Sequence, residues 1–226
     1  MTLLVHQAWF NNVPILVRQC LATWENAEGV DRRLYGLEDA ERILGPDLVR
    51  TCMTMPMTIS GKGSQVWRNR MRLLSDLLRY KLIGEEGGLW ADGDTSVLRH
   101  PVRDLLQLGE DEFVLFSPKA REVKGSFING LLYASGRARQ SVLDMYERSR
   151  QIVTSLGHIR DAIGNVTGPH AMRRWPEVKR RDRVIEWPMV AKPLAATDDT
   201  VITVKFGRHG WPDDVVPGPK GWDPNA

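Results

Sequence analysis

The chain has 226 residues, of which 42% are hydrophobic and 26% are charged. This composition is typical of a globular domain and excludes a disordered, collagen-like or disulfide-dense chain. The formal net charge of +3 is too small to establish nucleic-acid binding, although it is compatible with phosphate-bearing ligands. A chain of this length removes roughly 70% of its unfolded surface from water, so it can form a core and a binding site without disulfides or structural metals.

The cysteines and the first residues bear on the cellular compartment. Cys20 and Cys52 fit no metal-binding spacing, and we expect both thiols to be reduced and buried. The apolar run over residues 1–5 is too short for the core of a signal peptide. It is also far shorter than the roughly 20 residues of a membrane span. These features predict a cytoplasmic protein without a transmembrane segment.

The first part of the chain alternates between strand-like and helix-like segments. An apolar run that ends at turn residues predicts a strand over residues 3–10, and residues 33–37 are a short candidate for a second strand. Apolar residues at three- and four-residue spacing predict helices over 14–29 and 38–50, the second interrupted at Gly45-Pro46. The order β-α-β-α favours an α/β fold, in which a parallel sheet is flanked by helices and ligands bind beyond the carboxyl ends of the strands.

The strongest helical pattern covers residues 64–83, after an irregular, methionine-rich loop over 53–63. Its apolar positions recur every three or four residues, at Trp67, Met71, Leu74, Leu78 and Leu82. Arg72, Asp76 and Arg79 share another side of this helix, so two guanidiniums flank one carboxylate. Periodicity alone favours a solvated ion-pair face there.

The rest of the chain shows weaker signals. We predict further strands over 113–117, 126–133 and 201–206, and a helix over 137–156. The prolines and glycines of residues 212–226 predict an extended tail.

Two aspartates separated by one glycine, Asp92 and Asp94, follow the long helix and a Gly-Gly break. In an extended or turning backbone both side chains can point the same way, and Gly93 lets the main chain approach a ligand closely. Oxygen ligands with open coordination positions suit Mg²⁺ or Mn²⁺, which take their remaining ligands from water and substrate phosphates. The pair predicts a divalent cation beside a phosphate-bearing ligand, although isolated pairs of this kind are also common in surface turns.

The residues around this pair extend the pattern. Ser75-Asp76-Leu77-Leu78-Arg79-Tyr80 is followed by Gly87-Gly88-Leu89-Trp90-Ala91-Asp92-Gly93-Asp94-Thr95. The combination resembles the DXD-containing sugar transferases of the capsular-polysaccharide and yeast-type mannosyltransferase superfamily. Other segments are similar to the same family, and the likeness covers nearly the whole chain, though the second half matches loosely. These segments are Val5-His6-Gln7-Ala8-Trp9, Cys20-Leu21-Ala22-Thr23-Trp24, Phe127-Ile128-Asn129 and Thr167-Gly168-Pro169.

The resemblance implies a single GT-A domain over residues 1–211, Rossmann-like, with a mostly parallel central sheet flanked by helices, followed by the tail at 212–226. It implies a glycosyltransferase of the hexosyltransferase type that uses a UDP- or GDP-sugar as donor, requires Mn²⁺ or Mg²⁺ and retains the anomeric configuration. The acceptor stays open between a glycan, a lipid-linked acceptor and DNA.

The resemblance also implies roles for the motif residues. Asp94 is the expected direct metal ligand, whereas Asp92 is expected to hold the ribose or a metal-bound water. Asp76 and Arg79 are expected to contact the donor sugar and its diphosphate, since a guanidinium can give a forked pair of hydrogen bonds to oxygens. Trp9 is a candidate platform for stacking the nucleobase, with core packing as the alternative.

Three more residues enter through the resemblance. Asn129 is expected near the donor, where its side chain could steady the positive charge that develops on the sugar. The segment Gly207-Arg208-His209-Gly210-Trp211 is similar to the C-terminal segment of the family that returns to the donor site. It implies that His209 completes the metal shell and that Trp211 contacts the substrate. The segment is shorter than is usual in the family, so a plain loop histidine is the alternative for His209.

Two rival functions remain open at this point. Phosphatases with an Asp-x-Asp-x-Thr loop also pair two aspartates, but their pair follows the first strand, whereas here it follows a long helix in mid-chain. A non-catalytic module is the other rival, because residues 173–183 carry six cations that could bind nucleic acid or an anionic membrane surface. The same cations could instead be a solvated face, or could guide an anionic acceptor toward a transferase site.

Overall fold

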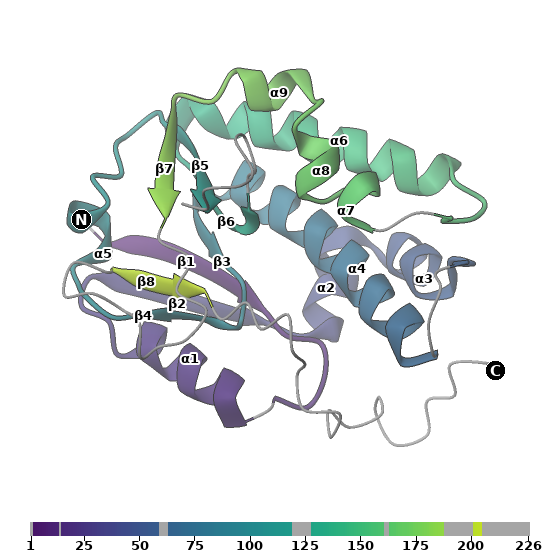
Figure 1. The fold of residues 1–226 in the computed structure, drawn as a ribbon, viewed down its shortest axis with the longest axis horizontal. Helices are drawn as coiled ribbons and strands as arrows, with labels where there is room; N and C mark the ends of the chain where they lie inside the picture. Colours follow the sequence, from purple (N-terminus) through teal and green to yellow (C-terminus); the bar gives the residue numbers. More distant parts are fainter. Residues whose placement is uncertain are drawn as a thin grey trace.

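The computed structural model of the chain describes residues 2–13, 15–58, 63–118, 128–160, 163–187 and 201–204. A six-stranded sheet forms its centre (Figure 1). The strands of this sheet are β1 (Leu3–Ala8), β2 (Val30–Tyr35), β3 (Gly88–Ala91), β5 (Phe113–Pro118), β6 (Ile128–Ala134) and β7 (Arg183–Trp187). Their order across the sheet is β2-β1-β3-β6-β5-β7.

The sheet is mostly parallel, as the alternation of the first elements predicts. β1 pairs in parallel with β2 and β3, and β5 pairs in parallel with β7. β6 is antiparallel to both of its neighbours, β3 and β5. The carboxyl ends of β1, β2, β3, β5 and β7 therefore lie at one edge of the sheet, and β6 begins at that same edge.

Helices cover both faces of the sheet, so the predicted α/β class is confirmed. One face packs against the larger set, whose apolar side chains form one core cluster with the strands. This set comprises α2 (Leu37–Leu44), α3 (Pro46–Thr54), α4 (Gly63–Glu85), α6 (Arg139–Ser155), α7 (Ile163–Val166), α8 (Pro169–Met172) and α9 (Pro176–Lys179), with a 3₁₀ turn at Gly136–Ala138 before α6.

The other face of the sheet packs against a smaller layer, around a second core cluster. This layer comprises α1 (Ile15–Glu25), α5 (Val102–Leu105) and an antiparallel pair of short strands, β4 (Thr95–Val97) and β8 (Ile202–Val204). Figure 1 shows α1 and the β4–β8 pair on one side, and α4 and α6 on the other.

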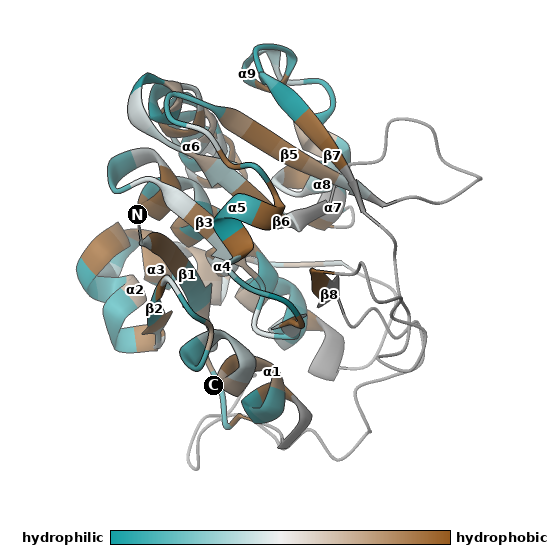
Figure 2. Cartoon of the chain, turned by 90° about the vertical axis from the view of Figure 1, so that its left-hand side faces the viewer, coloured by the Kyte–Doolittle hydropathy of each residue, from teal (hydrophilic) through white to brown (hydrophobic). Residues whose placement is uncertain are grey.

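The strands between the two layers are apolar on both faces. In β5, Phe113 and Leu115 belong to the cluster under α4 and α6, whereas Val114 and Phe116 belong to the cluster under the smaller layer. This alternation follows from the two-residue period of a strand, and burial on both sides accounts for the continuous apolar run. Figure 2 shows β5 as a hydrophobic strand and the outer helix α9 as mostly hydrophilic.

The long helix α4 is more deeply buried than its heptad-like pattern indicates. Besides the predicted apolar positions, Leu73, Leu77, Tyr80 and Ile83 are also fully buried. The reason is its position, because α4 packs against α6 and α3 as well as against the sheet. A helix covered on several sides carries apolar residues around most of its circumference.

Some predicted boundaries shift in the structure. The second strand runs over Val30–Tyr35 and not over 33–37. It is an edge strand whose polar residues Asp31 and Arg32 hide its start from a search for apolar runs, while its pairing with β1 fixes that start. The predicted interruption at Gly45-Pro46 is confirmed, since Gly45 has a φ of +88° between α2 and α3.

The structure also bears on the predictions for the cysteines and for a membrane span. Cys20 and Cys52 are buried free thiols, and burial raises the pKa of the Cys52 thiol to about 12. Of the helices in the described ranges, none has the length and apolarity that crossing a membrane requires. The predicted tail at 212–226 lies outside the described residues.

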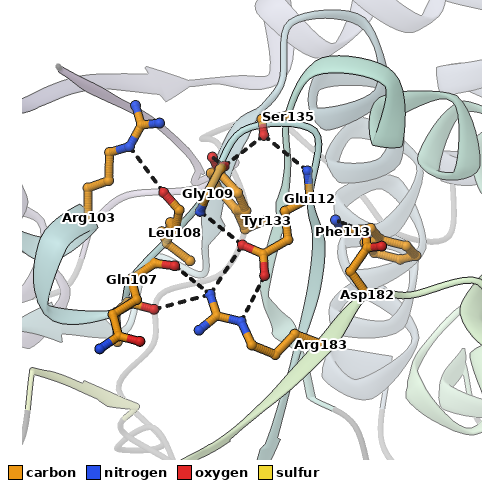
Figure 3. Close-up of polar contacts among 11 residues, drawn as sticks. Arg103, Gln107, Leu108, Gly109, Glu112, Phe113, Tyr133, Ser135, Asp182 and Arg183 are labelled. Atoms are coloured by element: carbon orange, nitrogen blue, oxygen red, sulfur yellow. Dashed lines mark hydrogen bonds and ion pairs between the residues drawn. The ribbon is translucent and has the colours of Figure 1, made fainter.

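A polar cluster lies at the edge of the sheet opposite the carboxyl ends of the parallel strands. Arg183, the first residue of β7, makes a forked ion pair with Glu112, just before β5, with N–O distances of 2.8 and 3.1 Å. Arg183 also donates to the Gln107 carbonyl at 2.7 Å, and Glu112 accepts from the Gly109 amide at 2.9 Å. These bonds fix the loop between α5 and β5 against β7 (Figure 3).

Candidate functional site

The connection between α4 and β3 brings the two halves of the motif into contact. Gly87 and Gly88 form a tight turn with φ values of +78° and +94°, after which β3 runs back along α4. Arg79 precedes this turn and Asp92 follows it, and their side chains meet with 3.0 Å between Nη2 and Oδ1. The carboxyl end of β3 therefore faces Arg79, in the last third of α4.

The Asp92 carboxylate is held by two donors. Its Oδ1 accepts from Arg79 Nη2 at 3.0 Å and from the Trp90 indole N–H at 2.8 Å. No hydrogen bond joins Oδ2 to any residue that the structure describes, and 32% of the side chain is exposed. One oxygen thus fixes the orientation of the carboxylate, and the other is available to a hydroxyl or to water.

Gly130 on β6 makes room for this carboxylate. A Cβ atom at Gly130 would lie 2.8 Å from Asp92 Oδ2, and the Gly130 carbonyl accepts from the Asp92 amide at 2.9 Å. A side chain at residue 130 would therefore displace the carboxylate. The sequence signal was a glycine inside a predicted strand, which often marks a close approach of another group, but the resemblance directs attention to its neighbour Asn129.

Asp76 and Arg79 are buried, so the solvated ion-pair face, one of the two predictions open from periodicity, is wrong for these two residues. Asp76 is 4% exposed and Arg79 is 3% exposed, with 3.4 Å between Asp76 Oδ1 and Arg79 Nη1. The prediction failed because β3 and the segment at Thr167 cover this side of α4. Arg72, in contrast, is exposed as expected.

Thr167 fixes Asp76 from a distant part of the chain. The Thr167 hydroxyl donates to Asp76 Oδ2 at 2.8 Å, and the Thr167 carbonyl accepts from the Tyr80 hydroxyl at 2.8 Å. Arg79 also lies 5.1 Å from the centre of the Trp90 ring, in cation–π geometry. The guanidinium is thereby held between two carboxylates and an aromatic ring, at the carboxyl end of β3.

Asp92 and Asp94 lie in one turn between β3 and β4. The Asp92 carbonyl accepts from both the amide and the hydroxyl of Thr95, at 2.9 and 2.7 Å, which closes the turn. Asp94 is half-buried. Within the described ranges no group of three or more His, Cys, Asp or Glu side chains could hold a metal ion.

Two aspartates are nevertheless a donor set that fits Mg²⁺ or Mn²⁺, which retain waters and take further oxygens from a substrate. The structure favours different roles for the two. Asp92 already binds a guanidinium and an indole through Oδ1, which suits an orienting carboxylate. Asp94 then stands as the candidate direct ligand, and this assignment remains a prediction.

Trp9 lies against the same turn. It follows β1, and a Cβ atom at Gly93 would come within 2.9 Å of Trp9 Cε3, so only glycine fits there. The Trp9 indole donates to the Asn12 carbonyl at 3.2 Å, and the side chain is half-buried. Trp9 is absent from both core clusters of the described residues, so a partly exposed aromatic surface lies next to Asp92-Gly93-Asp94.

Several predicted site residues stay untested. Asn129 is in β6 next to Gly130, but its side chain lies outside the described part of the structure, as do His209 and Trp211. Their proposed contacts with sugar, metal and substrate therefore remain predictions. Sequence reasoning missed the roles of Trp90, Gly130 and Thr167, although the family-like strings include Trp90 and Thr167.

The cations of residues 173–183 do not form a single free surface. Arg183 belongs to the ion pair with Glu112, and Arg180 lies 3.9 Å from Asp144. Trp175 is buried, in edge-on contact with Tyr80. Arg174 is exposed and, with Trp175, borders a hollow of about 300 Å³ between α6 and α7–α8, whose lining includes none of the predicted site residues.

Comparison with known proteins adds evidence on the fold. No protein-family model and no curated protein sequence matches the chain. Among solved structures, it is similar to a glycosyltransferase involved in the glycosylation of the major capsid of PBCV-1, with a TM-score of 0.52 and 11% identity over 90% of this chain and 93% of that one. The chain shares the fold of this glycosyltransferase.

A second solved structure agrees. The glycosyltransferase GlyE of Streptococcus pneumoniae TIGR4, in its apo form, matches with a TM-score of 0.51 and 12% identity, over 92% of this chain and 55% of that one. At such low identity the likeness concerns the arrangement of helices and strands. Chemistry has to be argued from the side chains of this chain.

Proposed function

We propose that the protein is a metal-dependent glycosyltransferase that transfers a hexosyl group from a UDP- or GDP-sugar to an acceptor, with retention of the anomeric configuration. The observation that carries the proposal is the Asp92 carboxylate, fixed by Arg79 and Trp90 at the carboxyl end of β3. In open α/β sheets this edge is where ligands bind. The glycosyltransferase fold and the half-buried Asp94 in the same turn support it.

The proposed residues have distinct tasks. Asp94, with Mn²⁺ or Mg²⁺ bound, would place a positive charge where negative charge grows on the departing diphosphate. Asp92, oriented through Oδ1, presents Oδ2 to a ribose hydroxyl or to water. Arg79 is buried between Asp76 and Asp92 and orients the Asp92 carboxylate, and its contact with the donor's sugar or diphosphate stays a prediction. Trp9 offers a ring face to the nucleobase.

The test is nucleotide release from a panel of UDP- and GDP-sugars in the presence of Mn²⁺. We expect slow hydrolysis of one donor, stopped by EDTA. Asp94→Asn should lower this rate on the order of a hundredfold, because charge stabilisation of the leaving group is lost. Asp47→Asn is the matched control, since Asp47 is an exposed aspartate on α3, and its rate should equal that of the wild type.

Two results would contradict the proposed glycosyltransferase activity. If the wild-type chain releases no nucleotide from any donor, or if Asp94→Asn keeps the full rate while its thermal unfolding is unchanged, the proposal is wrong. Hydrolysis of p-nitrophenyl phosphate would favour the phosphatase, and metal-independent DNA or liposome binding without donor turnover would favour the non-catalytic module.

A further inference from the structure

A line of arginines runs along α4 away from the candidate site. Arg68, Arg72 and Arg79 are four and seven residues apart. At 3.6 residues per turn these spacings place all three on one side of the helix. Arg79 is buried against Asp92, Arg72 is exposed and Arg68 is half-buried.

This line extends beyond the carboxyl ends of the strands. Because β3 runs back along α4, residues earlier in α4 than Arg79 lie progressively farther past the end of β3. At 1.5 Å per residue, Arg72 is about 10 Å along the helix axis from Arg79. The first turns of α4 also reach the loop after β1. Trp67 Nε1 donates to the Asn11 side-chain oxygen at 2.9 Å when the Asn11 amide is oriented so that its nitrogen donates to the Phe10 carbonyl. Arg68 and Arg72 therefore belong to the wall above the edge where Trp9 and Asp92 lie.

The arginines of α4 differ in whether a nearby carboxylate neutralises their charge. Arg79 stands between the carboxylates of Asp76 and Asp92. Lys81, also on α4, pairs with Glu85. Neither Arg68 nor Arg72 has an ion pair or hydrogen bond to any residue in the described ranges. Two uncompensated guanidiniums one turn apart are thus presented on the site side of α4.

We propose that Arg68 and Arg72 bind a phosphate monoester carried by the acceptor. This inference rests on the proposed function, in which the donor diphosphate is bound near Asp94 and Arg79. Side chains four residues apart on a helix have Cβ atoms about 5–6 Å from each other. A phosphate monoester has nearly two negative charges and three acceptor oxygens, so it can satisfy both guanidiniums, whereas one guanidinium fork already satisfies a carboxylate.

The experiment measures binding of two phosphate monoesters by titration calorimetry in EDTA. The probes are glycerol 3-phosphate, a soluble phosphate monoester, and farnesyl phosphate, a phosphate monoester on a lipid chain, with glycerol and farnesol as neutral counterparts. We expect both phosphates to bind and both alcohols to bind much more weakly. The double variant Arg68→Glu with Arg72→Glu should raise the Kd about tenfold or more. Arg174→Glu, an exposed arginine on the segment between α8 and α9, should leave the Kd unchanged.

The relative affinities of the two probes distinguish a lipid-linked acceptor from a soluble one. Tighter binding of farnesyl phosphate assigns a lipid-linked acceptor, and equal binding assigns a soluble one. Displacement of the phosphate by UDP with Mn²⁺ would overturn the inference, because the arginines would then serve the donor. An unchanged Kd in the double variant, or binding of duplex DNA alone, would also overturn it.

A single substitution checks for damage to the fold. Arg72→Gln, with thermal unfolding like that of the wild type, should still raise the Kd of both phosphates, and an unaltered Kd counts against the inference. The proposed function fails separately, through the absence of donor hydrolysis by the wild type. In that event an arginine-dependent phosphate site would persist, and its assignment to an acceptor would be wrong.

Discussion

The buried polar residues around Asp92 are arranged as a connected chain. Thr167 donates to Asp76, Asp76 pairs with Arg79, and Arg79 pairs with Asp92. A buried charge costs free energy unless it is paired and hydrogen-bonded. Each link therefore fixes the next one, and the orientation of Asp92 depends on Thr167, which bonds to a residue 91 positions before it in sequence.

A second buried polar residue, His6 on β1, gives the protein a predicted pH dependence. His6 is fully buried, with 2.9 Å from Nε2 to the Gly87 carbonyl and 2.9 Å from Nδ1 to the Tyr35 hydroxyl. Since a carbonyl only accepts, Nε2 donates to it, and in the neutral ring Nδ1 then accepts from the Tyr35 hydroxyl. Burial lowers the pKa of His6 below 6.5, and the Gly87 carbonyl and Glu86 only partly oppose this effect.

The free energy of unfolding should fall as the pH drops below 6.5. The unfolded chain gains a proton there that the folded chain resists, so the loss is at most about 1.4 kcal/mol per pH unit and stops below the folded pKa. Urea unfolding between pH 5 and 8 measures this slope. In His6→Gln, which keeps a donor for Gly87 but does not titrate, this component of the slope should disappear. The same slope in both proteins would assign it to other groups.

At the scale of elements, the turn between α4 and β3 decides where Asp92 lies. Gly88 has a φ of +94°, and a Cβ atom there would lie 2.4 Å from the Leu4 carbonyl oxygen on β1. The backbone of β3 thus approaches β1 at a point where a side chain has no space. Both the left-handed conformation and the close contact require glycine.

Gly88→Ala should lower the free energy of unfolding by at least about 2 kcal/mol, because strain in φ and a clash with backbone act together. Gly29→Ala is the matched control. Gly29 also has a positive φ, of +71°, but no atom lies within 4 Å of its Cβ position, so only the conformational cost of about 1 kcal/mol applies. Equal losses in the two variants, measured by urea unfolding, would contradict the steric explanation.

At the scale of the whole molecule, the two edges of the sheet have different tasks. The carboxyl edge carries Trp9, Asp92 and Asp94, whereas the opposite edge carries the Arg183–Glu112 cluster (Figure 3). That cluster joins β7 to the loop before β5, and its side chains are mostly satisfied by one another. We therefore assign it to stability and not to ligand binding.

Arg183→Met should lower the free energy of unfolding by about 1–2 kcal/mol, since the forked pair with Glu112 and the bond to the Gln107 carbonyl are lost at a partly exposed site. The affinity for the donor nucleotide with Mn²⁺, measured by calorimetry, should stay within about twofold. A large loss of affinity would show that the two edges are coupled.

The sequence alone predicted the α/β class, the long helix and the interruption at Gly45-Pro46, and it left an extended or a turning backbone open at Asp92 and Asp94. These features depend on local periodicity and on glycine and proline, which act over a few residues. It misplaced β2, and periodicity alone left a solvated face open for Asp76 and Arg79, because the partners that cover them come from other parts of the chain.

Residue types and their spacing therefore determined which side chains are available for chemistry. Only the tertiary structure decided that Arg79 is buried between Asp76 and Asp92, that Gly130 leaves space for the Asp92 carboxylate, and that Arg68 and Arg72 stay uncompensated among the described residues. The physical reason is that burial and pairing of charges depend on contacts between distant segments, and a periodic pattern along one helix contains no information about what packs against it.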